Sequence, residues 1–115
     1  MYNTQYYTHN LLTFIHTPLF DESMADAGMT DAELRQLQAA LQADPDAGDL
    51  IPGTGGARTV RIRARSRGKR GGGRVVYYHR RNGDTIYLPF VYTKAQAADL
   101  SAAGKRVVRK LIQEL

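Results

Sequence analysis

The pattern of apolar and polar residues in the first third of the chain predicts one strand and two helices. An apolar run over residues 11–15 is typical of a short strand that ends before a proline. Residues 18–27 follow as a helix with that proline at its first position, where helices favour it. Thr30 and Glu33 have the spacing of a capping box, which marks the start of a second helix and predicts a helical hairpin. The apolar stripe of the second helix consists of Leu34, Leu37 and Leu41.

The middle of the chain predicts three strands. Residues 59–64 alternate strictly, so that apolar side chains lie on one face and arginines on the other. Residues 74–79 and 85–92 are rich in β-branched and aromatic side chains, and the Asn-Gly pair between them is typical of a hairpin turn. Pro89 falls inside the second of these strands, which makes it either an edge strand or a bulged one.

The last predicted element is a helix that ends at Leu115, with Asp99 or Ser101 as its N-cap. Its expected buried side consists of Val107, Val108, Leu111, Ile112 and Leu115. Helices beside hairpin strands belong to the α+β class. The pattern therefore predicts a mostly antiparallel sheet with an N-terminal helical hairpin and a C-terminal helix.

Length and composition indicate one globular domain. The chain has 115 residues, of which 43% are hydrophobic and 23% charged, and we expect a single domain over residues 11–115 behind a frayed tail at 1–10. The absence of cysteine excludes disulfides, a thiolate zinc site and a cysteine nucleophile. The N-terminus has no basic signal region, and no apolar stretch approaches the roughly 20 residues of a membrane span. We therefore expect a cytoplasmic protein with no membrane partner.

Charge is divided unevenly along the chain. Residues 1–49 carry eight acids and one base, whereas residues 50–83 carry nine arginines, one lysine and no acid. Guanidinium groups meet phosphate oxygens in bidentate pairs, so a basic segment on an alternating strand favours a nucleic-acid partner over a merely solvated loop. The basic positions are Arg58, Arg61, Arg63, Arg65, Arg67, Lys69, Arg70, Arg74, Arg80 and Arg81.

Motifs for other chemistries do not fit. The glycine-rich segment that begins at Gly53 lacks the third glycine of a dinucleotide fingerprint, because Arg58 stands at that position. The Gly68-Lys69 pair lacks the serine or threonine that follows the lysine in a P-loop. The three histidines are scattered and form no helical pair, so we expect no metal site and no cofactor. They are His9, His16 and His79.

Several short motifs occur in the order that is typical of a known family. They are Pro45-Asp46-Ala47-Gly48-Asp49, Gly53-Thr54-Gly55-Gly56, Arg61 with Arg63, Arg67-Gly68-Lys69, Gly72-Gly73-Arg74-Val75-Val76-Tyr77-Tyr78, Val91-Tyr92-Thr93-Lys94 and Asp99-Leu100-Ser101. In these motifs the chain resembles the HigB branch of the RelE-like toxins, the mRNA interferases of bacterial type II toxin-antitoxin systems. The resemblance covers residues 11–115.

This resemblance implies a RelE-like fold and a ribosome-dependent endoribonuclease, a hydrolase that inhibits translation by cutting mRNA in the ribosomal A site, in contact with 16S rRNA. In the wider family the ribose 2′-hydroxyl attacks the adjacent phosphate, and neither a metal nor another cofactor is needed. A cognate helix-turn-helix antitoxin of the HigA type is the implied protein partner. By motif position, the implied catalytic residues are Arg61, Arg63, Arg74, Tyr92 and Lys94.

The chemistry of the side chains suggests which residues perform each part of such a reaction. Attack by a 2′-hydroxyl needs charge stabilisation on the phosphorane, a base for the hydroxyl and an acid for the 5′-oxygen. The arginines stay charged at neutral pH, so they are electrostatic clamps rather than proton carriers. Lys69 or Lys94 is the candidate base, and Tyr92 or Tyr78 is expected to share proton transfer or to stack on a base. The expected RNA-binding residues are Arg58, Arg65, Arg67, Lys69, Arg70 and Tyr78.

Strand alternation predicts where some of these side chains point. Tyr77 and Tyr78 are adjacent on one strand, so we expect at least one of them in the core. His79 lies opposite to Arg74 by alternation and is expected to be partly buried near the hairpin end. Tyr92 ends its strand and is expected to be exposed.

Two other functions use the same sequence features. A non-catalytic RNA-binding or DNA-binding module would present the same basic sheet, and composition does not separate it from a nuclease. An interaction protein would instead show no affinity for RNA at physiological salt. Substitution of Arg74 and the salt dependence of binding distinguish the three.

Overall fold

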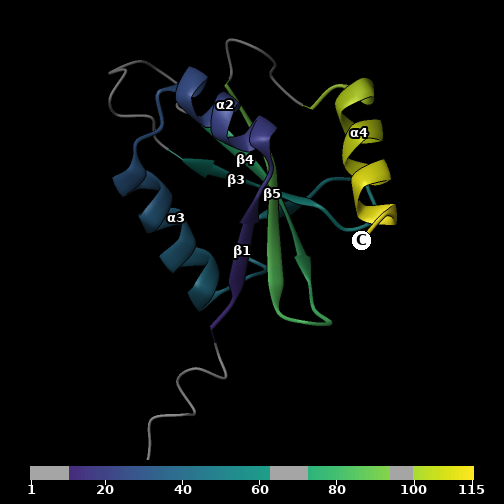
Figure 1. Ribbon diagram of the computed structural model, residues 1–115. Coiled ribbons are helices and arrows are strands. Elements are labelled where there is room, and N and C mark those ends of the chain that lie inside the picture. Colours follow the sequence, from purple (N-terminus) through teal and green to yellow (C-terminus); the bar gives the residue numbers. More distant parts are fainter. Residues whose placement is uncertain (1–10, 63–72, 94–99) are drawn as a thin grey trace, which may run out of the picture.

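The structure is a computed structural model that describes residues 11–62, 73–93 and 100–115. Its elements are β1 (Thr13–His16), α2 (Pro18–Ala27), α3 (Asp31–Ala43), β2 (Asp49–Leu50), β3 (Arg58–Ile62), β4 (Gly73–Arg80), β5 (Thr85–Thr93) and α4 (Ala102–Gln113). The strands form one sheet in the order β1-β5-β4-β3-β2. Only the pair of β1 and β5 is parallel among these described strands. The predicted α+β class with a mostly antiparallel sheet is therefore confirmed (Figure 1).

Local capping signals set the bounds of the two N-terminal helices. Thr17 accepts a hydrogen bond from the Phe20 amide through Oγ1 at 3.0 Å and starts α2, which ends at Gly28 in the left-handed region with φ 76°. The predicted capping box is present, because Thr30 and Glu33 satisfy one another's backbone amides at the start of α3. The helix α2 spans the predicted residues, and α3 starts at the predicted capping box.

The sheet separates two apolar clusters. The larger lies on the face covered by α2 and α3, and it contains Leu37 and Leu41 of the predicted stripe. The smaller lies between the opposite face and α4, around Val76 and Val108 (Figure 1). Alternation along β4 explains this division, because Val75 and Tyr77 face the first cluster whereas Val76 faces the second.

A bulge accommodates Pro89 within the sheet. Val76 pairs with Phe90, but Tyr78 pairs with Tyr87, so β5 has one extra residue between these two pairs. Since β5 lies between β1 and β4, the bulged alternative is correct and the edge-strand alternative is wrong. The carbonyl of Pro89 accepts a hydrogen bond from the Thr17 hydroxyl at 2.6 Å, which joins the bulge to the start of α2.

Burial of α4 differs from the prediction at two positions. Val108 is fully buried, and Leu111 and Ile112 are half-buried, but Val107 is 55% exposed and Leu115 is 38% exposed. The physical reason is that α4 packs on the sheet with a narrow stripe, centred on Val108 and Ile112 at helical spacing.

Among the described residues, no helix has the length and apolar character that a membrane span needs. The predicted tail at residues 1–10 lies outside them.

Candidate nucleic-acid interface

Three of the predicted catalytic residues lie in a row across three strands. Arg61 of β3 is directly opposite Arg74 of β4, and Arg74 is directly opposite Tyr92 of β5. Side chains at opposed positions share a face of the sheet. This row lies on the face that packs against α4, because Val76 and Tyr92 belong to the cluster that contains Val108.

Two residues of the row border a cavity of about 350 Å³, which we call the arginine cavity. Arg74 and Tyr92 line it from the sheet, and Lys105 lines it from the first turn of α4. Asp49 and Thr59 line the side formed by β2 and β3. The remaining described residues that line it are Leu50, Ile51, Pro52 and Leu100. Two cations, one carboxylate and a phenol thus converge on a space large enough for part of a nucleotide.

The electrostatics of the row favour an anion. Opposed like charges in a sheet repel each other, so the pair of Arg61 and Arg74 costs stability unless a ligand neutralises it. Within residues 11–62, 73–93 and 100–115, neither arginine forms an ion pair. The Nε of Arg74 is shielded from solvent and has no hydrogen-bond partner there either. A phosphate that accepts from these guanidinium groups would supply the missing acceptors.

Tyr92 is buried, contrary to the expectation of exposure. It is 8% exposed, and it lies in the apolar cluster with Val76 and Val108. The physical reason is that α4 covers this end of β5, a contact between distant segments that strand position alone does not indicate. Tyr92 nevertheless lines the arginine cavity.

Lys105 and Thr59 are cavity residues that sequence reasoning missed. No local signal identifies Lys105, because its place at the cavity depends on how α4 crosses the sheet. For Thr59 a signal exists: it alternates with Arg61 on β3 and therefore shares that residue's face.

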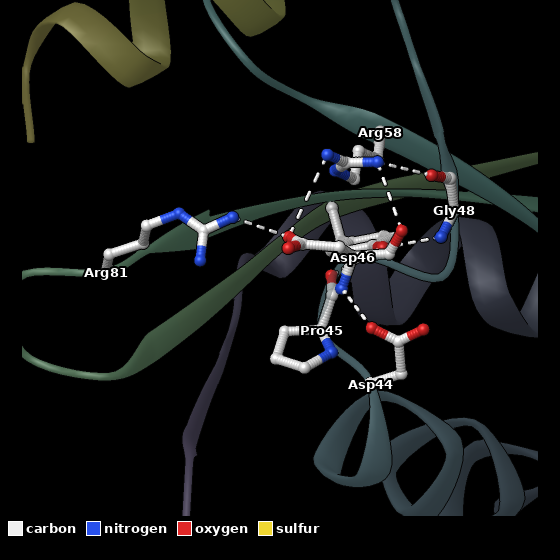
Figure 2. A network of polar contacts seen from close by, with 7 residues as sticks. Asp44, Pro45, Asp46, Gly48, Arg58 and Arg81 are labelled. Atoms are coloured by element: carbon white, nitrogen blue, oxygen red, sulfur yellow. Dashed lines mark hydrogen bonds and ion pairs between the residues drawn. The ribbon is translucent and has the colours of Figure 1, made fainter.

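Arg58, a predicted RNA-binding residue, is held by internal partners. Its Nη1 donates to the carbonyl oxygens of Gly48 at 2.7 Å and Asp46 at 3.1 Å, and its Nη2 lies 3.8 Å from the Asp46 carboxylate (Figure 2). Arg81 donates to the same carboxylate at 2.7 Å. The hydrogen bond from Arg81 is the main reason that the pKa of Asp46 lies below its usual value of 3.8. Arg58 thus fastens the segment before β2 to the start of β3.

The remaining aromatic predictions follow the alternation of β4. Tyr77 is fully buried, and burial raises the pKa of its phenol above the usual 10.0. Tyr78 is half-buried and points to the opposite face, which confirms that one of the two tyrosines is in the core. His79 is half-buried near the hairpin end, as predicted, and is out of phase with Arg74.

Six predicted site residues fall outside the described ranges. They are Arg63, Arg65, Arg67, Lys69, Arg70 and Lys94. Both lysines proposed as the base are among them. The described part of the site therefore consists of Arg61, Arg74 and Tyr92, together with Lys105.

Comparison with known proteins supports the fold. No protein-family model matches the chain. A structure of E. coli toxin RelE, a double-arginine mutant in the free state, matches with a TM-score of 0.55 at 13% identity, over 84% of this chain and 98% of that one. A chain of the archaeal RelE-RelB complex from Pyrococcus horikoshii matches with a TM-score of 0.48 at 18% identity, over 76% and 99% of the two chains. With its N-terminal helices, five-stranded sheet and C-terminal helix, the chain has the RelE-like α+β fold.

Proposed function

We propose that this chain is the toxin of a type II toxin-antitoxin system, of the HigB branch, and that it cuts translated mRNA in the ribosomal A site. The observation that carries the proposal is the row of Arg61, Arg74 and Tyr92 beside the arginine cavity. The RelE-like fold and the motif order support the same function. A cation-rich cavity with a phenol suits a reaction on a phosphodiester.

The proposed reaction is attack by the ribose 2′-hydroxyl on the adjacent phosphorus. The 2′-oxygen forms a bond to phosphorus, the bond to the 5′-oxygen breaks, and the products are a cyclic phosphate and a free 5′-hydroxyl. Negative charge grows on the phosphorane oxygens as this happens. In this proposal Arg74 and Arg61, which are opposed in the sheet, stabilise that charge, because fixed guanidinium donors need no reorganisation during the reaction.

Proton transfer requires groups other than arginine. Within the described residues of the arginine cavity, the side chains of Asp49, Tyr92 and Lys105 are those that can exchange a proton. We assign Tyr92 and Lys105 as candidates for the base that takes the proton of the 2′-hydroxyl and the acid that gives a proton to the 5′-oxygen. Lys69 and Lys94 stay candidates from the sequence.

The proposed partners follow from this function. The ribosome would present mRNA to the basic face, and 16S rRNA would contact the arginines that flank it. The cognate antitoxin, a helix-turn-helix protein of the HigA type, would neutralise the toxin. An inhibitor of such a basic surface is expected to bring acidic side chains to it.

The test is induced expression in bacteria, with growth followed and mRNA 5′ ends mapped. Arg74→Ala should lower cleavage by about hundredfold, because it removes a donor to the developing charge. Arg35→Ala is the matched control, since Arg35 is an exposed arginine on α3, which covers the opposite face of the sheet. Thermal melting of each purified variant checks that the fold survives. Arrest and in-frame cuts with the parent and Arg35→Ala, but not with Arg74→Ala, are expected.

Other outcomes would contradict the proposal in distinct ways. If Arg74→Ala cuts mRNA like the parent, the assigned site is wrong. If the folded parent neither arrests growth nor cuts mRNA but binds RNA, the chain is a non-catalytic binding module. In that case each phosphate-binding arginine should lower the salt slope by about 0.7 when removed.

A further inference from the structure

A second cavity lies at the other end of β4, beside the β4–β5 turn. It has a volume of about 460 Å³, and we call it the hairpin cavity. β3 begins at Arg58, which pairs with Tyr77, so the last three residues of β4 extend beyond β3 and leave this side of the sheet open. The side chains that matter below are Tyr78, Arg80, Arg81, Asn82, Arg58 and Asp46.

Hydrogen-bond donors exceed acceptors in this cavity. The one carboxylate among its described lining residues, that of Asp46, already pairs with Arg81 at 2.7 Å and lies 3.8 Å from Arg58 (Figure 2). Arg81 uses one Nη for that bond, and a guanidinium has five N–H donors. Arg80 is half-buried, and its guanidinium group has no hydrogen bond or ion pair with any residue that the structure describes. The cavity therefore holds uncompensated positive charge, which favours an anionic ligand.

An aromatic surface borders the same space. Tyr78 is half-buried, and its ring lies next to Gly56, where a Cβ atom would come within 3.4 Å of the ring carbon Cε1. Gly56 has φ 120°, a conformation that only glycine adopts without strain, so the backbone passes close to the ring without a side chain over it. A base can stack on such a ring, as bases do on aromatic side chains of proteins that bind single strands.

The hairpin cavity and the arginine cavity are connected by one strand. Arg74, Tyr78 and Arg80 alternate along β4 and share the face that packs against α4. Arg74 and Arg80 are six residues apart, a distance of about 20 Å along a strand. This separation is too long for one phosphate to bridge and suits an extended strand that touches both ends.

We propose that the hairpin cavity is a second phosphate subsite, which binds an RNA phosphate through Arg80 and Arg81 while a neighbouring base stacks on Tyr78. The inference rests on the proposed function, because it takes the ligand to be the RNA whose scissile phosphate sits at Arg74. The subsite holds the RNA several nucleotides from the scissile bond. It is a binding site, and it takes no part in the bond-breaking step.

The test uses short single-stranded RNA with a 2′-O-methyl group on every ribose, which can bind but cannot supply the nucleophile. Affinity is measured by fluorescence anisotropy for this RNA and for a dinucleotide that is too short to reach both cavities. Arg80→Ala should weaken binding of the longer RNA by about tenfold, as expected for loss of a charged hydrogen bond. It should also reduce the salt slope by about 0.7, the value for one phosphate contact on a single strand. Dinucleotide binding should not change.

Two control variants separate the possible failures. Arg35→Ala removes the same charge from an exposed position on α3 and should leave both affinities unchanged. Arg74→Ala should weaken binding of both RNAs. If Arg80→Ala behaves like Arg35→Ala while Arg74→Ala weakens binding, the second subsite is refuted and the proposed function stands. If Arg74→Ala also has no effect on either RNA, the proposed function fails as well.

Discussion

The hydroxyl of Tyr77 provides a strong test of how the segment before β2 is held. It donates to the carbonyl of Pro45 at 2.8 Å and accepts from the amide of Gly48 at 2.9 Å, and the residue is fully buried. Gly48 is itself buried, and a Cβ there would lie 2.6 Å from the Thr59 carbonyl oxygen. The backbone and the ring are therefore in close contact, with little room for water to replace the hydroxyl.

Tyr77→Phe should destabilise the protein by about 2 to 3 kcal/mol, because a buried amide loses its partner and a partly buried carbonyl loses one. The corresponding fall in Tm is about 10 °C for a domain of this size. The assay is urea unfolding followed by circular dichroism, with thermal melting as a second measurement. Tyr87→Phe is the matched control, because the Tyr87 hydroxyl makes no hydrogen bond with the described residues.

A change below about 0.5 kcal/mol, the usual range for surface substitutions, would refute this reasoning. It would mean that water or a backbone shift satisfies Gly48 and Pro45 when the hydroxyl is absent. The same variant also separates stability from chemistry. Tyr77 faces the α2 and α3 side of the sheet, so under the proposed function folded Tyr77→Phe should cut RNA at the same rate as the parent.

Two further predictions concern charge and packing. Asp46 has a lowered pKa, so its pairs with Arg81 and Arg58 stabilise the protein above the unfolded pKa of about 3.8 and this contribution is lost as the pH falls through the lower folded value. Asp46→Asn should therefore reduce the loss of thermal stability on acidification from neutral pH, and an unchanged profile would show that these exposed pairs contribute nothing. Val108→Ala should cost about 2 kcal/mol in urea unfolding, whereas Val107→Ala, at a 55% exposed position, should be nearly neutral. Equal effects of the two valine variants would contradict the packing of α4.

Local signals predicted the elements that local interactions determine. The capping box at Thr30 acts within one helical turn, and the turn before β5 needs only residues that accept positive φ, as Gly83 and Asp84 do at 114° and 52°. The alternation of β3 likewise needs only one buried face, and it placed Val60 and Ile62 opposite to Arg61. Each of these predictions depends on residues that are close together in the sequence.

Features that depend on distant contacts were missed. The two-residue strand β2 exists because Asp49 pairs with Thr59, ten residues later. Exposure of Val107, burial of Tyr92 and the approach of Lys105 to the arginine cavity all follow from where α4 lies on the sheet. The periodicity of a helix tells which of its residues share a face, but not how wide a stripe the sheet will cover.

Most of the segment from Pro45 to Asp49 holds structure in place rather than lining the candidate site. Asp46 and Gly48 supply the carbonyls that hold Arg58, and Pro45 and Gly48 hold the Tyr77 hydroxyl. Asp49 of the same segment lines the arginine cavity, but Pro45, Asp46 and Gly48 do not. Their effect on the site is indirect, since they fix the start of β3 and hence the register that brings Arg61 opposite Arg74.

The bulge at Pro89 sets the register of β5 that places Tyr92 opposite Arg74. Ile86 and Leu88 face the larger core before the bulge, and strict alternation would turn Tyr92 toward that core as well. The extra residue shifts the phase, so that Val91 faces the larger core and Tyr92 faces the opposite side, across from Arg74. Proline at this position lacks the N–H that a regular ladder would use, and it therefore suits the irregular pairing. Pro89 is therefore consistent with the irregular pairing of β5 that brings Tyr92 opposite Arg74.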